Sequence, residues 1–414
     1  MLTSAITQIT QIQLTSLNGG FDKITNLEGL QGFIALEKLT LYGNDDGLTS
    51  INITNNMNLK ELYFFGNYLN HLLVSAPLLE TLVIENPAPF LQTLNVINCP
   101  MLNYLWCPNN SLSTLDVSNN HALEKLLVHN NNLTQLIFGN NPQLKILSNY
   151  NNNLFSMDLT SCTLLETVLC WNNNLTSINL TNCPQLINLT ASDNDLSSLD
   201  LTQNTLLKVV GCVSNNLTFL DVSQNIVLEI LVLTNNNITT LNLQNNPQLR
   251  EIGCKNNNLT YLNLQNGSNS LLNGTVVYNQ IAYPRFDATN NPNLRCIFVD
   301  DVANCQANWL TVDPTSHFVG TQTECNNFLS NQSFIKSEII VSPNPTTSTI
   351  NIDFGKKLEL STLTLTNVLG QTISSQTINN LDKTRLEINE PNGVYFLEIV
   401  NEKLERQVFK VVKQ

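Results

Sequence analysis

The chain has few charged residues, and most of those are acidic. Only 12% of its 414 residues are charged, with 19 lysine and arginine residues against 32 aspartate and glutamate residues. Nucleic acids and anionic membrane surfaces bind basic patches, so neither is expected as a partner. The charge is also uneven, because residues 335–414 carry nine basic and nine acidic residues while residues 1–334 carry ten basic and 23 acidic ones. This change in composition predicts a domain boundary near residue 335.

Long apolar runs are also absent. The chain contains no stretch of about 18 or more apolar residues, the length that crosses a bilayer as a helix, so no transmembrane segment is predicted. Its first residues, MLTSAITQITQIQL, lack the basic start and the continuous apolar core of a secretory signal peptide. The N-terminal sequence therefore does not by itself indicate export.

Motifs of the common enzyme classes are missing as well. The four histidines have neither the HExxH spacing nor a paired-ligand spacing, and GxSxG, phosphate-loop and dinucleotide-binding motifs do not occur. Acidic pairs such as Asp45-Asp46 and Asp300-Asp301 are more simply interpreted as solvated turns than as calcium ligands. We therefore predict no catalytic residue, no metal site and no cofactor.

A repeat with a period of about 21 residues runs through most of the chain. Each unit has the pattern LxxLxLxxNxL, which resembles that of the leucine-rich repeat family over about residues 24 to 300. The resemblance implies a solenoid of stacked coils. One column of the repeat consists of Leu112, Leu133, Leu154, Leu175, Leu196, Leu217, Ile238 and Leu259.

Each unit has room for little more than two short extended segments. The fourth and sixth residues of the pattern point inward from a parallel strand, and the asparagine then turns the chain out of the strand while its amide bonds neighbouring coils. Because so short a unit leaves little room for a helix, the back of each coil is expected to be extended too. We predict a mainly β, curved solenoid (residues 1–300) of about a dozen coils stacked ~4.8 Å apart. Its asparagine ladder is expected to contain Asn67, Asn110, Asn131, Asn152, Asn173, Asn194, Asn215, Asn236 and Asn257.

Seven of the ten cysteines keep the phase of the repeat. Buried cysteine behaves as a small apolar residue with a weak donor, which suits scaffold positions. Metal ligands would have to converge, whereas these thiols are spread over many coils. A disulfide between Cys162 and Cys183, on adjacent coils, is the alternative to scaffold thiols. The sixth, core position holds Cys107, Cys170, Cys212 and Cys254, and the end of the second strand holds Cys99, Cys162 and Cys183 in a second ladder.

The other three cysteines break the phase. Cys296 takes the third position of the last unit, which is predicted to face the open side of the sheet, and Cys305 and Cys325 follow in a segment without repeats. A solenoid needs a cap over its last coil, so residues 301–334 are predicted to be a C-terminal cap and linker. A Cys296–Cys325 disulfide would clamp this cap, and Cys305–Cys325 is the competing pairing.

From residue 339 the sequence changes to six or seven short alternating strands separated by turn residues, the pattern of a small antiparallel β-sandwich. This segment resembles the C-terminal sorting domain of proteins exported by the type IX secretion system of Bacteroidetes, with a generic immunoglobulin-like module as the alternative. The resemblance implies that residues 335–414 engage the secretion machinery and are removed on export. It rests on Pro343, Asn344 and Pro345, on Gly370 and Gln371, on Gly393, Val394 and Tyr395, and on Lys410 and Lys413.

The resemblance also implies that the protein is secreted or attached to the outer cell surface. Proteins exported in this way first cross the inner membrane with an N-terminal signal, which this sequence lacks. We therefore expect the N-terminus to be truncated, and a cytoplasmic leucine-rich repeat scaffold is the rival interpretation.

Aromatic residues gather on the face of the predicted sheet that points away from the core. Exposed rings on a rigid curved sheet suit a protein or glycan ligand, and equally they stack and stabilise the sheet. We predict an adhesin-like binding protein, with a structural surface component without a discrete ligand as the alternative. The candidate ligand-binding residues, at the third, fifth and seventh positions of the strands, are Tyr42, Tyr63, Phe65, Tyr104, Trp106, His129, Tyr150 and Trp171.

Overall fold

A computed structural model describes residues 6–15, 27–42, 48–49, 51, 53, 55–86, 91–331, 339–358, 360–401 and 406–414. The chain divides into two compact units, residues 1–320 and residues 321–414. Residues 301–334, predicted as one cap and linker, are thus divided between the two units. The boundary predicted at residue 335 lies outside the described residues.

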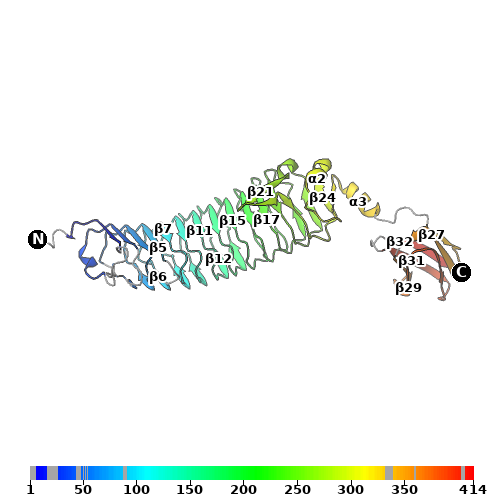
Figure 1. Ribbon diagram of the computed structural model, residues 1–414, viewed down its shortest axis with the longest axis horizontal. Coiled ribbons are helices and arrows are strands. Elements are labelled where there is room, and N and C mark those ends of the chain that lie inside the picture. The colour runs from blue at the N-terminus through cyan, green and yellow to red at the C-terminus, as the bar shows by residue number, and fades with distance from the viewer. Residues whose placement is uncertain are drawn as a thin grey trace. The chain divides into compact units, whose positions relative to one another are not determined.

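The first unit is the predicted parallel β-solenoid (Figure 1). Its strands pair in parallel with one strand per coil, as in the register of Leu147 with Val168 on the next coil. We call this 13-stranded sheet the front sheet. Its first strand, residues 11–15, pairs with residues 38–42 and lies within the predicted solenoid, upstream of the region that resembles the leucine-rich repeat. Its strands are β1 (Gln11–Thr15), β2 (Lys38–Tyr42), β3 (Glu61–Phe65), β5 (Thr81–Glu85), β7 (Tyr104–Trp106), β9 (Lys125–Leu127), β11 (Ile146–Ser148), β13 (Thr167–Leu169), β15 (Asn188–Thr190), β16 (Val209–Gly211), β17 (Ile230–Val232), β19 (Glu251–Gly253) and β23 (Phe286–Asp287).

The back of the solenoid is also extended, as predicted. Short parallel strands pair there in sets of two, and a set of four lies at the C-terminal end. The apolar side chains of the front and back strands fill one continuous core between them. The back strands are β4 (His71–Leu73), β6 (Thr93–Asn95), β8 (Thr114–Asp116), β10 (Gln135–Ile137), β12 (Ser156–Asp158), β14 (Ser177–Asn179), β18 (Thr240–Asn242), β20 (Tyr261–Leu264), β24 (Cys296–Val299) and β25 (His317–Val319).

The predicted asparagine ladder is present and is buried. Asn173 is a typical member: its Nδ2 donates to the carbonyl oxygens of Asn149 (3.1 Å) and Cys170 (3.2 Å), and its Oδ1 accepts from the backbone N–H of Leu154 (3.0 Å). The residue before each ladder asparagine turns the chain with a positive φ, which is 53° at Asn172. Asparagine tolerates this left-handed conformation better than most residues, which explains the paired asparagines in the repeat.

The second ladder, on the back of the coils, is confirmed as well. Asn204 donates from Nδ2 to the carbonyl oxygens of Leu180 (3.1 Å) and Cys183 (2.8 Å), whereas its Oδ1 has no hydrogen-bond partner among the described residues. Cys183 takes the same place one coil earlier, and its Sγ donates to Leu159 O at 3.3 Å. Since this slot needs only a donor, a thiol can replace the amide.

All seven in-phase cysteines are buried free thiols, so the alternative Cys162–Cys183 disulfide is not formed. Burial raises the pKa of Cys107, Cys183 and Cys212 to about 12. Only a small fraction of each thiol is therefore ionised at pH 8, and the thiolate is the reactive form.

We expect these thiols to be unreactive toward a chromogenic disulfide reagent in the native protein at pH 8, and to react quickly in guanidinium. Because a thiol with a pKa of about 12 gains thiolate about tenfold with each pH unit, the slow native reaction should rise with pH without levelling off near pH 8.5. Rapid native labelling with a midpoint near the ordinary thiol pKa of about 8.5 would contradict burial of the ladder.

The end of the solenoid differs from the prediction. Asn290 and Asn256 take equivalent turn positions on adjacent coils and are 34 residues apart, whereas Asn172 and Asn151 are 21 residues apart. Asn291 continues the asparagine ladder after this longer interval, in which a β-hairpin is inserted. The hairpin consists of β21 (Thr275–Tyr278) and β22 (Ile281–Pro284), preceded by the 3₁₀ turn η2 (Asn269–Leu272).

The insertion shifts the phase of the last coil. Cys296 therefore lies buried in back strand β24. The prediction that it faces the open side of the front sheet is wrong.

The last coil is covered by the helix α2 (Val302–Asn308) and the strand β25, which pairs with β24. Trp309 lies under this cover, stacked on Phe286 with ring centroids 4.4 Å apart, and its Nε1 donates to Asn273 Oδ1. Of the three out-of-phase cysteines, Cys305 is free and Cys296 and Cys325 are disulfide-bonded, so the competing Cys305–Cys325 pairing is not formed.

The second unit begins with the helix α3 (Gln322–Asn331) and contains two antiparallel sheets whose apolar sides share one core. The three-stranded sheet has the order β26-β27-β30 and the four-stranded sheet the order β29-β28-β31-β32. This agrees with the predicted small antiparallel domain. The strands are β26 (Ile340–Ser342), β27 (Thr349–Leu358), β28 (Ser361–Asn367), β29 (Thr372–Ile378), β30 (Leu381–Glu387), β31 (Gly393–Asn401) and β32 (Arg406–Lys413).

One of the predicted sorting-motif residues, Asn344, joins the turn between β26 and β27 to the last strand, β32. Asn344, between Pro343 and Pro345, donates from Nδ2 to Lys410 O (2.6 Å) and accepts from Val412 N (2.9 Å). Tyr395 is buried and its hydroxyl donates to Pro391 O, while Lys413 Nζ donates to Glu390 O. Gly370 has a φ of 77° in the turn after β28. Of these residues, Asn344 fastens the last strand to the turn before β27.

Candidate binding surface

The outward face of the front sheet carries three columns of side chains, at the first and third residues of each short strand and at the second residue after it. Trp106 belongs to the middle column, and His129, Tyr150 and Trp171 follow one another in the last column on consecutive coils. All four side chains are partly exposed. We call these four residues the aromatic strip.

The rings of the aromatic strip form a continuous stack. His129 and Tyr150 have ring centroids 4.3 Å apart and an interplanar angle of 13°, and Tyr150 and Trp171 are 3.9 Å apart at 8°. Trp106 meets His129 edge-on, with centroids 6.0 Å apart. Burial lowers the pKa of His129, so its ring is predominantly neutral at pH 7 and stacks without a charge. Both faces of Tyr150 are covered, so this ring presents its edge.

Three of the remaining predicted residues, Tyr42, Tyr63 and Phe65, form a separate upstream cluster. Tyr42 and Phe65 stack with centroids 4.9 Å apart, and Tyr63 lies 6.1 Å from Phe65. Lys38 Nζ lies 4.9 Å from the Tyr63 ring centroid and pairs with Glu61 at 2.6 Å, which raises the pKa of Lys38. Tyr104 is partly buried between the cluster and the strip, and desolvation raises its pKa.

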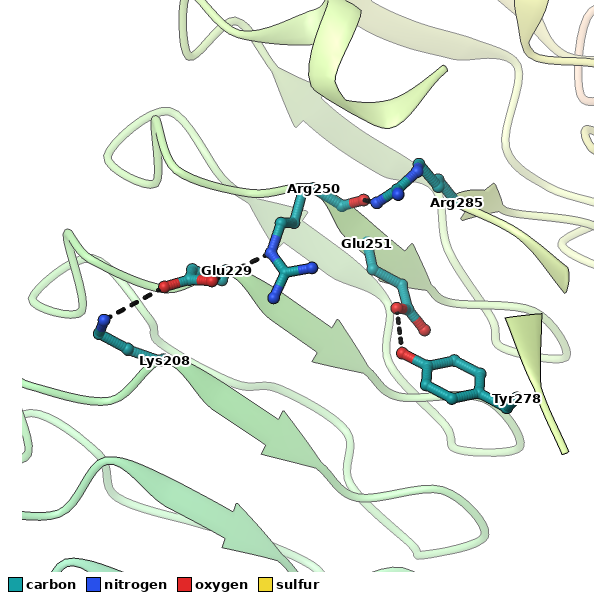
Figure 2. Close-up of polar contacts among 6 residues, drawn as sticks. All are labelled: Lys208, Glu229, Arg250, Glu251, Tyr278 and Arg285. Atoms are coloured by element: carbon teal, nitrogen blue, oxygen red, sulfur yellow. Dashed lines mark hydrogen bonds and ion pairs between the residues drawn. The ribbon is translucent and has the colours of Figure 1, made fainter. Parts of the chain in front are cut away.

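The downstream third of the front face is built differently, because the inserted hairpin stands beside it. Tyr278 at the hairpin tip donates its hydroxyl to Glu251 Oε2 at 2.6 Å (Figure 2). The two turn residues, Asn279 and Gln280, have φ values of 48° and 66°, which are typical of a tight two-residue hairpin turn. Between the hairpin and strands β16, β17 and β19 lies a groove of about 580 Å³.

An ion-pair chain runs beside this groove. Glu229 pairs with Lys208 (3.4 Å) on one neighbouring coil and with Arg250 (3.0 Å) on the other, and these contacts lower the pKa of Glu229. Arg285 donates from a guanidinium nitrogen to Arg250 O at 3.1 Å. Figure 2 shows Lys208 and Arg250 reaching toward Glu229, and Arg285 reaching toward the backbone of Arg250.

The residues that line this groove are not among the predicted ligand-binding residues. Two signals in the sequence could have indicated it. From Asn110 to Asn257 the ladder asparagines follow one another every 21 residues, whereas Asn291 comes 34 residues after Asn257. The inserted text TVVYNQIAYP also alternates on both sides of a turn dipeptide, as hairpins do.

The C-terminal unit matches a known family. Residues 341–414 match the secretion system C-terminal sorting domain family. None of the curated proteins matches the chain in sequence. The sorting domain indicates secretion or attachment to the outer surface.

Solved structures with the same architecture are leucine-rich repeat proteins. The functional domain of InlJ from Listeria monocytogenes, which includes a cysteine ladder, is 21% identical with a TM-score of 0.55, and the match covers 100% of this chain and 92% of that one. A leucine-rich repeat protein of Leptospira interrogans, LIC12759, is 16% identical with a TM-score of 0.46, and that match covers 78% of this chain and 88% of the other. The first of these supports the leucine-rich repeat fold.

Proposed function

We propose that this chain, a leucine-rich repeat solenoid with a C-terminal sorting domain, is a non-catalytic, adhesin-like protein that binds a partner outside the cell through its front sheet. The sorting domain supports the location, and the aromatic strip carries the binding hypothesis. Aromatic side chains are the commonest anchors of protein interfaces because they bury a large area with few rotatable bonds. The described part of the chain has no helix long and apolar enough to cross a membrane.

The geometry of the strip favours a protein partner over a glycan. A sugar ring binds best against an open aromatic face, but Tyr150 lies between His129 and Trp171, so its faces are already covered. The exposed ring edges carry positive partial charge and suit carbonyl oxygens and other side chains of a protein. We therefore propose a protein partner, with glycan binding as the competing outcome.

We expect Trp171→Ala, and separately the pair Trp106→Ala and Tyr150→Ala, to abolish partner capture. The full chain, labelled with a fluorophore, would be applied to arrays of purified extracellular proteins and of glycans. Removing a true anchor costs roughly 2 kcal/mol or more of binding free energy, a loss of about thirtyfold in affinity. The far-UV circular dichroism spectrum should stay nearly unchanged, although each lost stacking contact lowers stability by about 0.5–1.5 kcal/mol.

The matched control is Thr176→Ala on the back of the solenoid, where the side chain is exposed and makes one hydrogen bond, to Phe155 O. It should leave capture unchanged. If the strip variants retain all of their array signals, the rings only stabilise the sheet. Signals confined to glycans would instead show that the partner class is wrong.

A further inference from the structure

The groove beside the hairpin has an apolar floor that the structure keeps free of bulky side chains. Across four adjacent strands one row of outward positions reads Thr190, Gly211, Val232 and Gly253, each paired in register with the next. Small and β-branched residues therefore alternate along the floor. Tyr283 and Tyr278 of the hairpin form the wall on one side.

Gly211 is not explained by the backbone or by packing. Its φ lies outside the left-handed range that favours glycine, and a Cβ built there would meet nothing closer than Thr190 Cγ2 at 3.6 Å, an ordinary contact. Gly253 is tighter, because a Cβ would lie 3.1 Å from Val232 Cγ1. Glycine inside a strand weakens it, and such a position often marks a close approach by another molecule. The missing side chain at 211 creates the depth of the groove.

The lining of the groove carries acidic side chains, and the nearest cations, Arg250 and Arg285, lie outside the lining but close enough to Tyr278 to act against the rise of its pKa. The described lining includes the carboxylates of Glu251 and Asp287 and no lysine or arginine. Asp287 is engaged by Thr289, through the backbone N–H (3.0 Å) and the hydroxyl (2.7 Å). Glu251 is only 8% exposed and accepts from Tyr278, and within the described residues no basic side chain forms an ion pair with it.

We propose that this groove binds an extended segment of a partner protein, which places a large apolar side chain over Gly211 and a lysine or arginine beside Glu251. Val209, Ile230 and Val232 offer no hydrogen bonds, so sugar hydroxyls would lose their water partners there without replacement. The volume lies within the range of about 300–1,000 Å³ of ligand sites in proteins. The site is separate from the aromatic strip, and it stands whether or not the strip binds a ligand.

The probe for this proposal is a random linear-peptide library displayed on phage, selected on the full chain and counter-selected on Gly211→Leu. We expect the surviving peptides to combine an aromatic or large aliphatic residue with a lysine or arginine. A labelled synthetic copy of an enriched peptide, measured by fluorescence anisotropy, should lose at least about tenfold in affinity for Gly211→Leu and for Tyr283→Ala. Glu251→Gln should also bind it more weakly, with a smaller dependence on salt.

Two controls separate the site from the rest of the front face. Leu127→Phe adds bulk at the position equivalent to Gly211 four coils upstream, outside the groove, and should leave affinity unchanged. Trp106→Ala disrupts the aromatic strip and should also leave it unchanged. Circular dichroism and thermal melting establish that each variant is folded. The proposal would be overturned if no selected peptide distinguished the wild type from Gly211→Leu, or if the selected peptides lacked basic residues. It would also be overturned if Tyr283→Ala and Glu251→Gln bound the peptide as tightly as the wild type does.

Discussion

A carrier protein that bears its own N-terminal signal and is fused to residues 335–414 is expected to appear outside a host cell with a type IX secretion system. The same carrier without this segment should stay inside. The expectation follows from the match of residues 341–414 to the sorting-domain family and from the separate core of this unit. Export would be followed by immunoblotting of the medium and of the cell fraction.

The sharpest control is a fusion that ends before residue 406. This truncation removes strand β32, which pairs with β31 along its whole length and contributes the buried Val411. It also removes Lys410 and Val412, the backbone partners of Asn344. We expect complete retention of the truncated fusion. Export of the truncated fusion, or retention of the intact one in the competent host, would show that the folded segment is not the sorting signal.

The repeat was predictable because every coil repeats the same contacts. Asn173 and Cys170 stand at fixed positions of the repeat unit, so the sequence alone placed one in a ladder and the other in the core, and the structure confirms both. The stack of Tyr150 on Trp171 followed from the same periodicity, since equal positions on adjacent coils must lie one strand spacing apart.

Features that occur once in the chain were not predictable in this way. The hydrogen bond from Tyr278 to Glu251 depends on how an inserted hairpin folds back on the sheet. It has no counterpart in the other coils from which it could be predicted. The same insertion shifted the phase of the last coils, which is why Cys296 was assigned to the front sheet and lies on the back. The groove, the most unusual feature of the front face, arises from this single interruption.

The two ladders are expected to respond very differently to mutation. Replacing Asn173 by alanine should lower the free energy of unfolding by about 3 kcal/mol or more. The substitution leaves the buried N–H of Leu154 unpaired, which costs about 1–3 kcal/mol. It also removes one hydrogen bond from each of the carbonyls of Asn149 and Cys170, worth about 0.5–1.5 kcal/mol apiece, although these carbonyls still accept from other ladder asparagines. Because each coil contacts only its neighbours, the loss should weaken the stack locally and split it there.

Asn204→Cys, in the second ladder, is expected to change stability by less than about 1 kcal/mol. A thiol keeps one donor in the slot, as Cys183 already does one coil earlier, and the change removes the unpaired Oδ1 of Asn204. All three tryptophans, Trp106, Trp171 and Trp309, lie in the first unit, so urea unfolding followed by tryptophan fluorescence reports on the solenoid alone. Equal losses for the two variants would show that Asn173 contributes by filling space and not by bonding three backbone groups, because the two ladders differ in bonding and not in burial.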